Sequence, residues 1–536
     1  LHLFGYGNLS KEDLMNFRQL DSKTPGHPEY GHTVGVEATT GPLGAGMGMA
    51  VGMAMAEAHL ESVFNKENYP VVDHYTYVLG GDGCMMEGIS SAAFSLAGLS
   101  KLIVLYDSNR ISIEGSTDIA FRENVQERMQ AFGFQTITVE DGNDIDAIGK
   151  AIEAAKADTE HPSFITIKTQ IGFGCPAKQG KASAHGEPLG VENVEALRKN
   201  LNWPSEEPFF VPEEVYKNYS EIAEQKAEVE AAWNVMFAAY CEEYPEMEAL
   251  WNQYHNAKAG EALKDDAGFW AKQEKPEASR AISGRLINYI KDVLPNLFGG
   301  SADLAPSNKT NMKDAGDFSK EDRAGRNLHF GVRELAMAAI GNGIMLHGGL
   351  RAYVSTFFVF SDYCKPMARL SALMGVPLTY VFTHDSIGVG EDGPTHEPIE
   401  QMAALRAMPN FHVFRPCDAT ETEAAWYSAV TSEHTPTALV LTRQNLEPMA
   451  GSSREALKGG YIIDDCEGTP ELILIASGSE VALAVHAKET LAAEGQKVRV
   501  VSMPCMDLFE EQSAEYKESV LPKAVRKRVA VEALSD

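Results

Sequence analysis

The sequence lacks the features that place a chain in a membrane or direct it to secretion. No apolar run reaches the ~18 residues that a membrane-spanning helix needs. No basic segment followed by an apolar one opens the chain, so nothing marks it for secretion. We therefore expect no membrane partner.

Cysteine is scarce and irregularly placed. Seven cysteines occur among 536 residues, and none shows the paired C-x-x-C spacing. Disulfide frameworks and structural zinc sites need cysteines in regular pairs. The sequence predicts neither kind of site, and a reducing cytoplasm is the expected location.

Positively charged residues are fewer than negatively charged ones. The chain has 46 Lys and Arg residues against 76 Asp and Glu residues, a formal net charge of −30. Such an acidic chain repels nucleic acid and anionic lipid, so neither is expected as a partner. A phosphate-binding site would have to gather cations locally against this background.

The length and pattern of the chain predict several α/β domains. A chain of 536 residues exceeds what one hydrophobic core usually serves. Short apolar segments alternate with helical ones, which favours βαβ units and mostly parallel sheets. We expect an α/β domain (1–203), a helical connector with a solvated charged face (204–276), a second α/β domain (277–456) and a third (457–536).

Particular segments predict strands because they are short, apolar and rich in β-branched or aromatic residues. A helix is expected at Glu480–Ala493, closed by Gly495. The expected strands are Tyr75–Leu79, Leu102–Tyr106, Ser163–Thr169, Leu378–Thr383, Ala438–Thr442, Glu471–Ala476, Lys497–Ser502 and Arg528–Val531.

The segment YTYVLGGDGCMMEGIS predicts a strand, a tight turn and the start of a helix. Asp82 falls at the carboxyl end of the strand, and Gly83 beside it allows the backbone to approach a ligand closely. Asn109 ends the next strand, LIVLYDSN. Ligands bind at this edge of open parallel sheets, and these oxygens suit Mg²⁺ or Ca²⁺. A lone Gly-Asp-Gly is usually only a turn, but the two strand ends together resemble the thiamine-diphosphate motif.

Further segments extend the resemblance over nearly the whole chain. Segments similar to those of the transketolase family occur in that family's order: TPGHPEYGHTVGVEATTGPLGAGMGMAVGMAMAE, GDGCMMEGIS, GGSADLAPSN, HFGVRE, STFFVFSDY and THDSIGVGEDGPTHEP. The resemblance implies consecutive parallel-sheet domains of the thiamine-diphosphate-binding fold, followed by a partial third α/β domain. It also implies a homodimer with the active site at the subunit interface.

The resemblance implies a cofactor site for thiamine diphosphate and Mg²⁺, with Ca²⁺ or Mn²⁺ as alternative metals. Glu334, at the start of an apolar helical run, would share a proton with the pyrimidine N1′ and so promote the C2 ylid. A stripe such as Phe357, Phe360 and Tyr363 otherwise indicates core packing. The implied cofactor contacts are Gly41, Leu43, Asp82, Gly83, Asn109, His185, Asp303, Glu334, Phe357, Phe360 and Tyr363, and the implied metal ligands are Asp82, Asn109 and Ile111.

The resemblance also implies a substrate site for sugar phosphates. Taken singly, an arginine is usually a surface ion pair and a histidine is usually structural. The implied catalytic residues are Glu334, His396, His27 and His185. The implied substrate contacts are Arg280, Ser307, His384 and Arg443 for the phosphate, and Asp392, His396, His27 and His185 for hydroxyls and proton transfers.

The implied reaction is that of the pentose phosphate pathway. A two-carbon ketol unit passes reversibly from a ketose phosphate, such as xylulose 5-phosphate, to an aldose phosphate, such as ribose 5-phosphate or erythrose 4-phosphate. Cleavage of the C2–C3 bond of the donor leaves a dihydroxyethyl unit on the cofactor, and this unit then adds to the acceptor. The chain is therefore expected to be a transferase.

Several alternatives stay open at this point. Dihydroxyacetone synthase and 1-deoxyxylulose-5-phosphate synthase share the cofactor machinery. The family's chains begin before Leu1 and continue past Asp536, so a fragment or truncated gene product is expected, of poor activity and stability. A truncated, inactive homologue is the alternative of a different class, although an inactive copy need not keep Asp82, Asn109 and Glu334.

Overall fold

A computed structural model of the chain describes residues 1–7 and 9–534. The chain divides into two compact units, Leu1–Glu248 and Ala249–Asp536. Within the described residues, no helix combines the length and the apolar character needed to cross a membrane. Each of the seven cysteines is free, as the sequence predicts.

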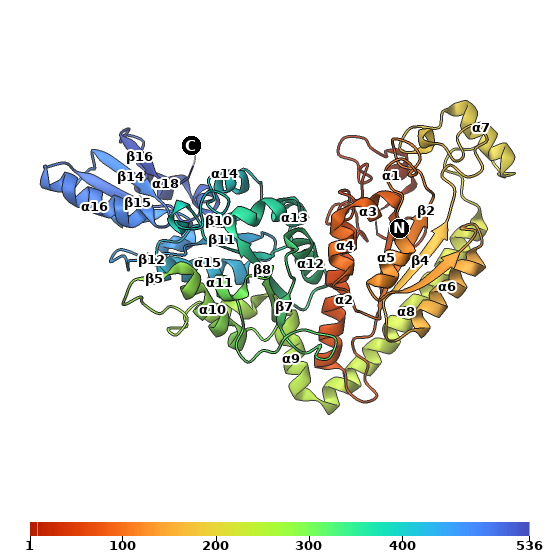
Figure 1. The fold of residues 1–536 in the computed structure, drawn as a ribbon, viewed down its shortest axis with the longest axis horizontal. Coiled ribbons are helices and arrows are strands. Elements are labelled where there is room, and N and C mark those ends of the chain that lie inside the picture. The colour runs from red at the N-terminus through yellow and green to blue at the C-terminus, as the bar shows by residue number, and fades with distance from the viewer. Residues whose placement is uncertain (8, 535–536) are drawn as a thin grey trace. The chain divides into compact units, whose positions relative to one another are not determined.

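The first unit is built on a four-stranded parallel sheet (Figure 1). In order across the sheet, its strands are β1 (Thr76–Gly81), β2 (Leu102–Ser108), β4 (Ser163–Lys168) and β3 (Gln135–Val139). Its helices include α1 (Lys11–Met15), α2 (Ala45–Phe64), α3 (Asp82–Met86), α4 (Gly88–Phe94), α5 (Val125–Ala131), α6 (Ile145–Ala157), η1 (Ala182–Ala184), α7 (Val191–Asn200) and α8 (Glu213–Glu243). Apolar side chains of β2, β3 and β4 pack against α6, where Ala151 and Ala155 are buried.

Helix α2 packs closely against β1. It is rich in alanine, glycine and methionine, and most of its residues are buried. A Cβ atom added to Gly80 of β1 would stand 1.8 Å from Cε of Met47, so a side chain at this position would require Met47 to move. The close approach fixes the strand end that carries Asp82.

The long helix α8 also packs on the first unit. Nε1 of Trp233 donates a hydrogen bond to the carbonyl of Val71 at 3.0 Å, and the Tyr240 hydroxyl donates to the carbonyl of Phe64 at 2.7 Å. Tyr240 is buried, whereas most of the helix surface is exposed or half-buried. Helix α9 (Pro245–His255) spans the boundary between the two units.

The second unit contains a six-stranded parallel sheet (Figure 1). In order, its strands are β10 (His412–Phe414), β11 (Thr437–Leu441), β9 (Thr379–Thr383), β8 (Arg351–Phe357), β6 (Leu297–Ser301) and β7 (Asn327–His329). Its helices are η2 (Ala257–Leu263), α10 (Ser279–Val293), α11 (Ala305–Asn308), α12 (Glu334–His347), η3 (Phe358–Phe360), α13 (Ser361–Met374), η4 (Ile387–Val389), α14 (Gln401–Arg406) and α15 (Ala419–Thr431). A two-stranded antiparallel pair, β5 (Glu277–Ala278) and β12 (Asn445–Leu446), lies outside the main sheet.

Helices cover both faces of the six-stranded sheet. Tyr353 of β8 belongs to the core formed with α10 and α15, in which Ile287 and Trp426 are fully buried. The next residue, Val354, faces the opposite side of the sheet and packs against α12. A Cβ atom added to Gly341 of α12 would stand 2.9 Å from the side chain of Val354. The carboxyl ends of the strands therefore emerge between two helical layers.

A third sheet of four strands follows. In order, its strands are β13 (Tyr461–Asp464), β15 (Val498–Ser502), β14 (Leu472–Ala476) and β16 (Arg528–Val531), and β13 alone is antiparallel to its neighbour. The helices of this part are η5 (Arg454–Lys458), α16 (Glu480–Ala493), α17 (Met506–Glu510) and α18 (Ala514–Val520). Alternate residues of β14 and β15 pack into two separate cores, one with α16 and one with α17 and α18.

The predicted strands are confirmed to within two residues at each end, and the helix Glu480–Ala493 is found at its predicted bounds. Eight strands of the described residues are absent from the predicted set: β3, β5, β6, β7, β8, β10, β12 and β13. β3 is an edge strand of mixed polarity, which weakens its apolar signal. β6 contains Gly299 and Gly300, and a Cβ on Gly300 would stand 1.8 Å from the carbonyl oxygen of Leu328. The parallel α/β architecture is as predicted.

Candidate active site

Asp82 and Asn109 lie at the same edge of the first sheet. Asp82 follows β1 and Asn109 follows β2, and these strands are parallel neighbours. Asp82 is 4% exposed, and its carboxylate accepts hydrogen bonds from the Tyr106 hydroxyl and, at 2.8 Å, from the backbone N–H of Arg110. Burial raises the pKa of Asp82, although these two hydrogen bonds act in the opposite direction. The Asn109 side-chain oxygen accepts from the backbone N–H of Ile111 at 2.9 Å.

This group of oxygens fits a hard divalent cation in its donor chemistry. A carboxylate and an amide oxygen are ligands that Mg²⁺ and Ca²⁺ accept, but either ion needs about six or more. Within the described residues, no three or more His, Cys, Asp or Glu side chains are grouped as a metal site. Asp82 and Asn109 would therefore share the ion with main-chain oxygens, water or an anionic ligand.

Four of the other predicted residues of the first unit lie close together in pairs, and His185 stands alone. A Cβ on Gly83 would stand 2.8 Å from Leu43, and a Cβ on Gly41 would stand 3.6 Å from His27. Leu43 is 55% exposed, an unusual position for leucine beside a polar strand end. His185 is exposed, and no hydrogen bond of the described residues joins its ring to another predicted residue.

In the second unit, four predicted phosphate-binding residues come together. Nη1 of Arg280 donates to the carbonyl of Ser307 at 2.9 Å and lies 3.4 Å from Nε2 of His384. Burial and then the charge of Arg443 lower the pKa of Arg280, so the two arginines are near enough to repel. Arg443 in turn forms an ion pair with Glu391, whose side chain is 67% exposed. A local surplus of positive charge thus exists within this acidic chain.

The hydrogen bonds around His384 define its tautomer. The Thr383 hydroxyl donates to the side-chain oxygen of Asn308 at 2.7 Å, so its oxygen is free to accept from Nδ1–H of His384 at 2.8 Å. Nε2 then carries a lone pair directed toward Arg280. Burial lowers the pKa of His384 to about 4, and the charges of Arg280 and Arg443 act in the same direction. The imidazole is therefore neutral at pH 7 in the free protein.

The predicted aromatic residues form one group with the two predicted site histidines of this unit, His384 and His396. Phe357 stacks parallel to Phe360 with 6.0 Å between ring centroids, and Phe360 lies 6.2 Å from Tyr363. The ring of His384 lies 3.8 Å from that of Phe357, and His396 meets Phe360 edge-on at 5.4 Å. Tyr363 is 62% exposed, so the group forms an open aromatic surface rather than an interior stripe. Such a surface fits a flat heteroaromatic ring.

Glu334 is the first residue of α12, as the sequence predicts. The residues from Ala336 to Ile344 are buried and, apart from Asn342, carry no polar side chain, while Glu334 itself is half-buried. The Thr356 hydroxyl lies 3.5 Å from its carboxylate, a long contact that leaves acceptor capacity unused. Burial, and then the charge of Glu334, raise the pKa of the Cys364 thiol well above its usual value.

Asp303 and Asp392 stand apart from these groups. Asp303 is exposed, has a φ of 60° and lines a cavity of about 450 Å³ together with Ser301 and His329. Asp392 is exposed in a loop, and no hydrogen bond or ion pair of the described residues joins it to another predicted residue.

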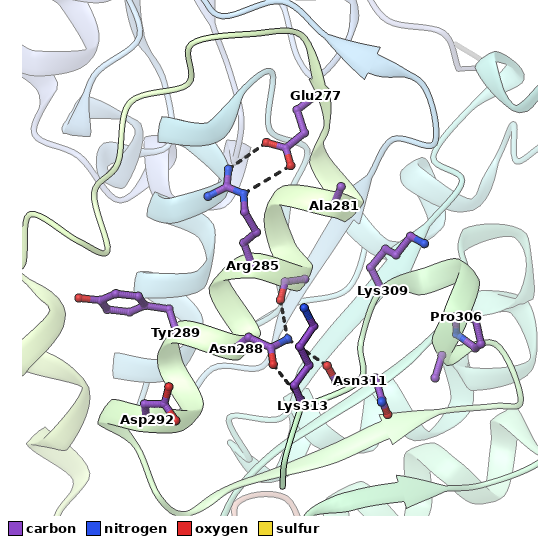
Figure 2. Close-up of a pocket in the computed structure, with 12 residues that line it drawn as sticks. Glu277, Ala281, Arg285, Asn288, Tyr289, Asp292, Pro306, Lys309, Asn311 and Lys313 are labelled. Atoms are coloured by element: carbon purple, nitrogen blue, oxygen red, sulfur yellow. Dashed lines mark hydrogen bonds and ion pairs between the residues drawn. The ribbon is translucent and has the colours of Figure 1, made fainter.

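A larger cavity of about 750 Å³ adjoins α10 and α11 (Figure 2). None of the predicted site residues lines it, although it borders the segments that carry Arg280 and Ser307. Figure 2 shows Arg285 paired with Glu277 at one end and Lys309 and Lys313 near the middle. The sequence carries little signal for this cavity, because only Ala305 and Pro306 of its lining residues fall in a recognised segment, GGSADLAPSN.

Several residues that hold the site together also escape sequence reasoning. Tyr106 supports Asp82, and Thr383 orients His384. Asp385 directly follows His384 and binds Arg415, which is fully buried. The signal for Asp385 was its position inside the segment THDS, whereas nothing in the local sequence marks Arg415.

Comparison with known proteins matches three regions of the chain to family models. Residues 1–259 match the family "Transketolase, thiamine diphosphate binding domain", 275–449 match "Transketolase, pyrimidine binding domain" and 459–536 match "Transketolase-like TK C-terminal domain". The chain is 54% identical over 541 residues to a transketolase of Halalkalibacterium halodurans, with 99% of this chain and 80% of that protein covered. It is 54% identical over 543 residues to a transketolase of Bacillus subtilis, covering 99% and 81%.

Solved structures give the same result. The transketolase from Leishmania mexicana superimposes with a TM-score of 0.95 at 44% identity, covering 99% of this chain and 79% of that one. A Pichia stipitis transketolase in complex with sedoheptulose 7-phosphate superimposes with a TM-score of 0.94 at 45% identity, covering 99% and 80%. The chain belongs to the transketolase family, whose members are transferases with a thiamine-diphosphate-binding domain.

Proposed function

We propose that the chain transfers a two-carbon ketol unit reversibly from a ketose phosphate, such as xylulose 5-phosphate, to an aldose phosphate, such as ribose 5-phosphate or erythrose 4-phosphate. The observation that carries this proposal is the group of Arg280, His384 and Arg443 in a chain of net charge −30. Three cationic or hydrogen-bonding groups converge where the rest of the molecule would repel a phosphate. The sugar phosphate bound by the Pichia stipitis relative supports the same substrate class.

Each phosphate contact has a distinct chemical contribution. Arg280 and Arg443 supply planar guanidinium forks that suit bidentate phosphate binding. Ser307 adds a hydroxyl, and neutral His384 supplies a ring nitrogen whose protonation rises when an anion binds. The hydroxyls of the sugar chain are assigned to Asp392, His396, His27 and His185, which also assist proton transfer.

Thiamine diphosphate and a divalent metal complete the proposed site. Asp82, Asn109 and Ile111 would hold the metal, with Gly41, Leu43, Gly83 and His185 beside the diphosphate. Phe357, Phe360 and Tyr363 would hold the pyrimidine ring, with Asp303 as a further contact. When bound, the cofactor supplies the nucleophilic carbon that carries the two-carbon unit between donor and acceptor. Glu334 would hold a proton between its carboxylate and the pyrimidine nitrogen N1′.

The finer organisation of the protein is part of the proposal. We propose a homodimer with the active site at the subunit interface, and the exposed apolar residues Val332, Tyr363 and Leu373 support a surface covered by a second copy. The free cysteines support a cytoplasmic location. The domains are assigned to 1–203, 277–456 and 457–536, with the helical connector at 204–276.

A coupled assay tests the function directly. The protein, loaded with thiamine diphosphate and Mg²⁺, is given xylulose 5-phosphate with either ribose 5-phosphate or formaldehyde as acceptor. We expect turnover with ribose 5-phosphate and sedoheptulose 7-phosphate as product. Preference for formaldehyde would instead indicate dihydroxyacetone synthase activity, and no turnover with any ketose phosphate would refute the proposal.

A further inference from the structure

The backbone of His384 is held in an unusual conformation. Its φ is 63°, in the left-handed region that residues other than glycine occupy uncommonly. Such a conformation persists where the surrounding structure enforces it. On one side, Thr383 is fixed by Asn308 at the end of β9. The residue on the other side, Asp385, must supply the second anchor.

Asp385 is anchored by a buried arginine. The side chains of Asp385 and Arg415 are both fully buried. Nε of Arg415 donates to Asp385 Oδ2 at 3.0 Å, and Nη2 lies 2.8 Å from the same oxygen. Neither charge is stable at this depth without the other. The loop after β9 is thus pinned one residue beyond His384.

Arg415 itself is enclosed by residues of the third sheet region. Its Nη1 donates to the carbonyl of Ser477 at 2.9 Å and forms an ion pair with Glu480 of α16. Its backbone N–H donates to the carbonyl of Pro504 at 2.8 Å, and its carbonyl accepts from Gly478 at 2.9 Å. Burial lowers the pKa of Arg415, but the charges of Asp385 and Glu480 outweigh this and raise it.

A second layer fixes these partners in turn. Glu480 accepts a hydrogen bond from the backbone N–H of Ala533 at 3.0 Å. Glu532 accepts two hydrogen bonds from Arg406, each of 2.7 Å, and one from the Ser477 hydroxyl. A connected set of ion pairs and hydrogen bonds therefore runs from Glu532 and Ala533 to Asp385, the residue after His384.

We propose that Asp385 and Arg415 are positioning residues through which the C-terminal domain sets the orientation of His384 at the substrate phosphate. This inference rests on the proposed binding of the substrate phosphate by His384. It gives the C-terminal domain, to which no site residue is assigned, a part in substrate recognition. Neither Asp385 nor Arg415 touches the substrate in this scheme.

Asp385→Asn tests the proposal because it keeps the size of the side chain and removes its charge. We expect the KM for xylulose 5-phosphate to rise about 10- to 100-fold, the size of effect found when the outer hydrogen-bond partner of a metal ligand is removed. The KM for hydroxypyruvate, a donor without phosphate, should not change, and kcat should change little with either donor. Inorganic phosphate should also inhibit the variant less strongly as a competitor of the phosphorylated donor.

Glu480→Gln is the second variant, chosen in case Asp385→Asn does not fold. Its side chain is 13% exposed and it leaves the Asp385–Arg415 pair in place. We expect the same selective rise in KM, but smaller. The matched control is Asp465→Asn, which breaks the contact of Asp465 with Arg499, a bidentate pair of 2.9 Å bonds in the same domain that does not touch Arg415.

The outcomes separate the inference from the proposed function. A selective loss for the phosphorylated donor in Asp385→Asn or Glu480→Gln, absent from Asp465→Asn, supports the inference. Equal losses for both donors, or equal losses in the control, overturn it. If Arg280→Met also fails to distinguish the two donors, the phosphate site itself is wrongly assigned; if only Arg280→Met distinguishes them, the inference alone fails.

Discussion

The guanidinium of Arg280 and the imidazole of His384 approach to 3.4 Å between Nη1 and Nε2. Two groups that can both carry positive charge are in contact, and Arg443 lowers the pKa of each. An anion placed among them would relieve this repulsion and favour their charged forms. The close approach of Arg280 and His384 is expected of a site that binds a phosphate.

Arg280→Met removes one cation from this group while keeping most of the side-chain length. Loss of a charge-assisted hydrogen bond costs about 1.5–3 kcal/mol, so kcat/KM for xylulose 5-phosphate should fall about 10- to 150-fold. The fall should be far smaller for hydroxypyruvate. Arg285→Met, on the same helix but paired with Glu277, is the control and should leave both values unchanged.

His384 should titrate far below the ordinary range for histidine. Its pKa is lowered to about 4, so it gains its proton only as the pH falls toward that value. The unfolded chain takes up this proton nearer pH 6.5, so His384 contributes stability that is present above that pH and is lost between about 6.5 and 4. NMR of ¹⁵N-histidine-labelled protein, assigned with His384→Gln, would measure the titration. Added inorganic phosphate should raise the apparent pKa; a titration near 6.5 without phosphate would contradict the description.

Asp82→Ala should abolish metal-dependent cofactor binding. The substitution removes the only carboxylate assigned to the metal, and Asn109 alone offers a single weak oxygen ligand. Calorimetry of thiamine diphosphate binding with and without Mg²⁺ would show the change. Asp118→Ala, which breaks a surface pair with Arg110 near the same loop, is the control. Unchanged Mg²⁺-dependent binding in Asp82→Ala would rule out its assignment.

Glu334→Gln should separate cofactor binding from catalysis. Glutamine keeps the shape at the start of α12 but cannot share an acidic proton with N1′ of the pyrimidine. Binding of thiamine diphosphate should survive, while exchange of its C2 proton, followed by NMR, should slow strongly. Exposed Glu321→Gln in the same unit serves as control. A wild-type exchange rate in Glu334→Gln would be incompatible with the role assigned to this residue.

Glu423 should make the fold less stable as the pH rises from about 4.5 to 8. It lies in α15, is 1% exposed, and its Oε1 has no hydrogen-bond partner within the described residues. Burial, and then the charge of Asp418, raise its pKa from 4.5 to about 8. The stability it contributes is complete below about pH 4.5 and is lost as the pH rises through 8.

Glu423→Gln should remove this loss, because glutamine does not ionise. Urea midpoints measured from pH 5 to 9 should fall with pH more steeply for the wild type than for the variant. Glu489→Gln, exposed on α16, should behave as the wild type. Parallel curves for Glu423→Gln and the wild type would show that Glu423 is already ionised when folded.

The fold and the predicted site were accessible from sequence to different degrees. Strands such as β2 and β9 are visible because strands buried on both faces form nearly continuous apolar segments. Asp82 and Asn109 could be placed together because their strands are parallel neighbours. The strand β6 could not be recognised, since its two glycines are required by backbone atoms of other strands, Gly299 by Tyr353 and Gly300 by Leu328.

Residues that act by positioning another residue were the hardest to predict from the sequence. Arg415 lies at the end of a three-residue strand, and its partners Asp385 and Glu480 are 30 and 65 positions away. A buried ion pair leaves no periodic or spacing signal in either segment. Thr383 is similar, because its role at His384 depends on Asn308, which is 75 positions away.

The short pair of β5 and β12 has a consequence for how the site is assembled during folding. It joins Ala278 to Asn445, and beside it Ser279 and Thr442 exchange hydrogen bonds across 163 positions. Arg280 and Arg443 therefore meet only when this large loop has closed, which carries an entropic cost. Partly folded molecules cannot present both arginines to one phosphate. A sugar phosphate would thus select fully folded chains from the refolding population and protect them from reopening.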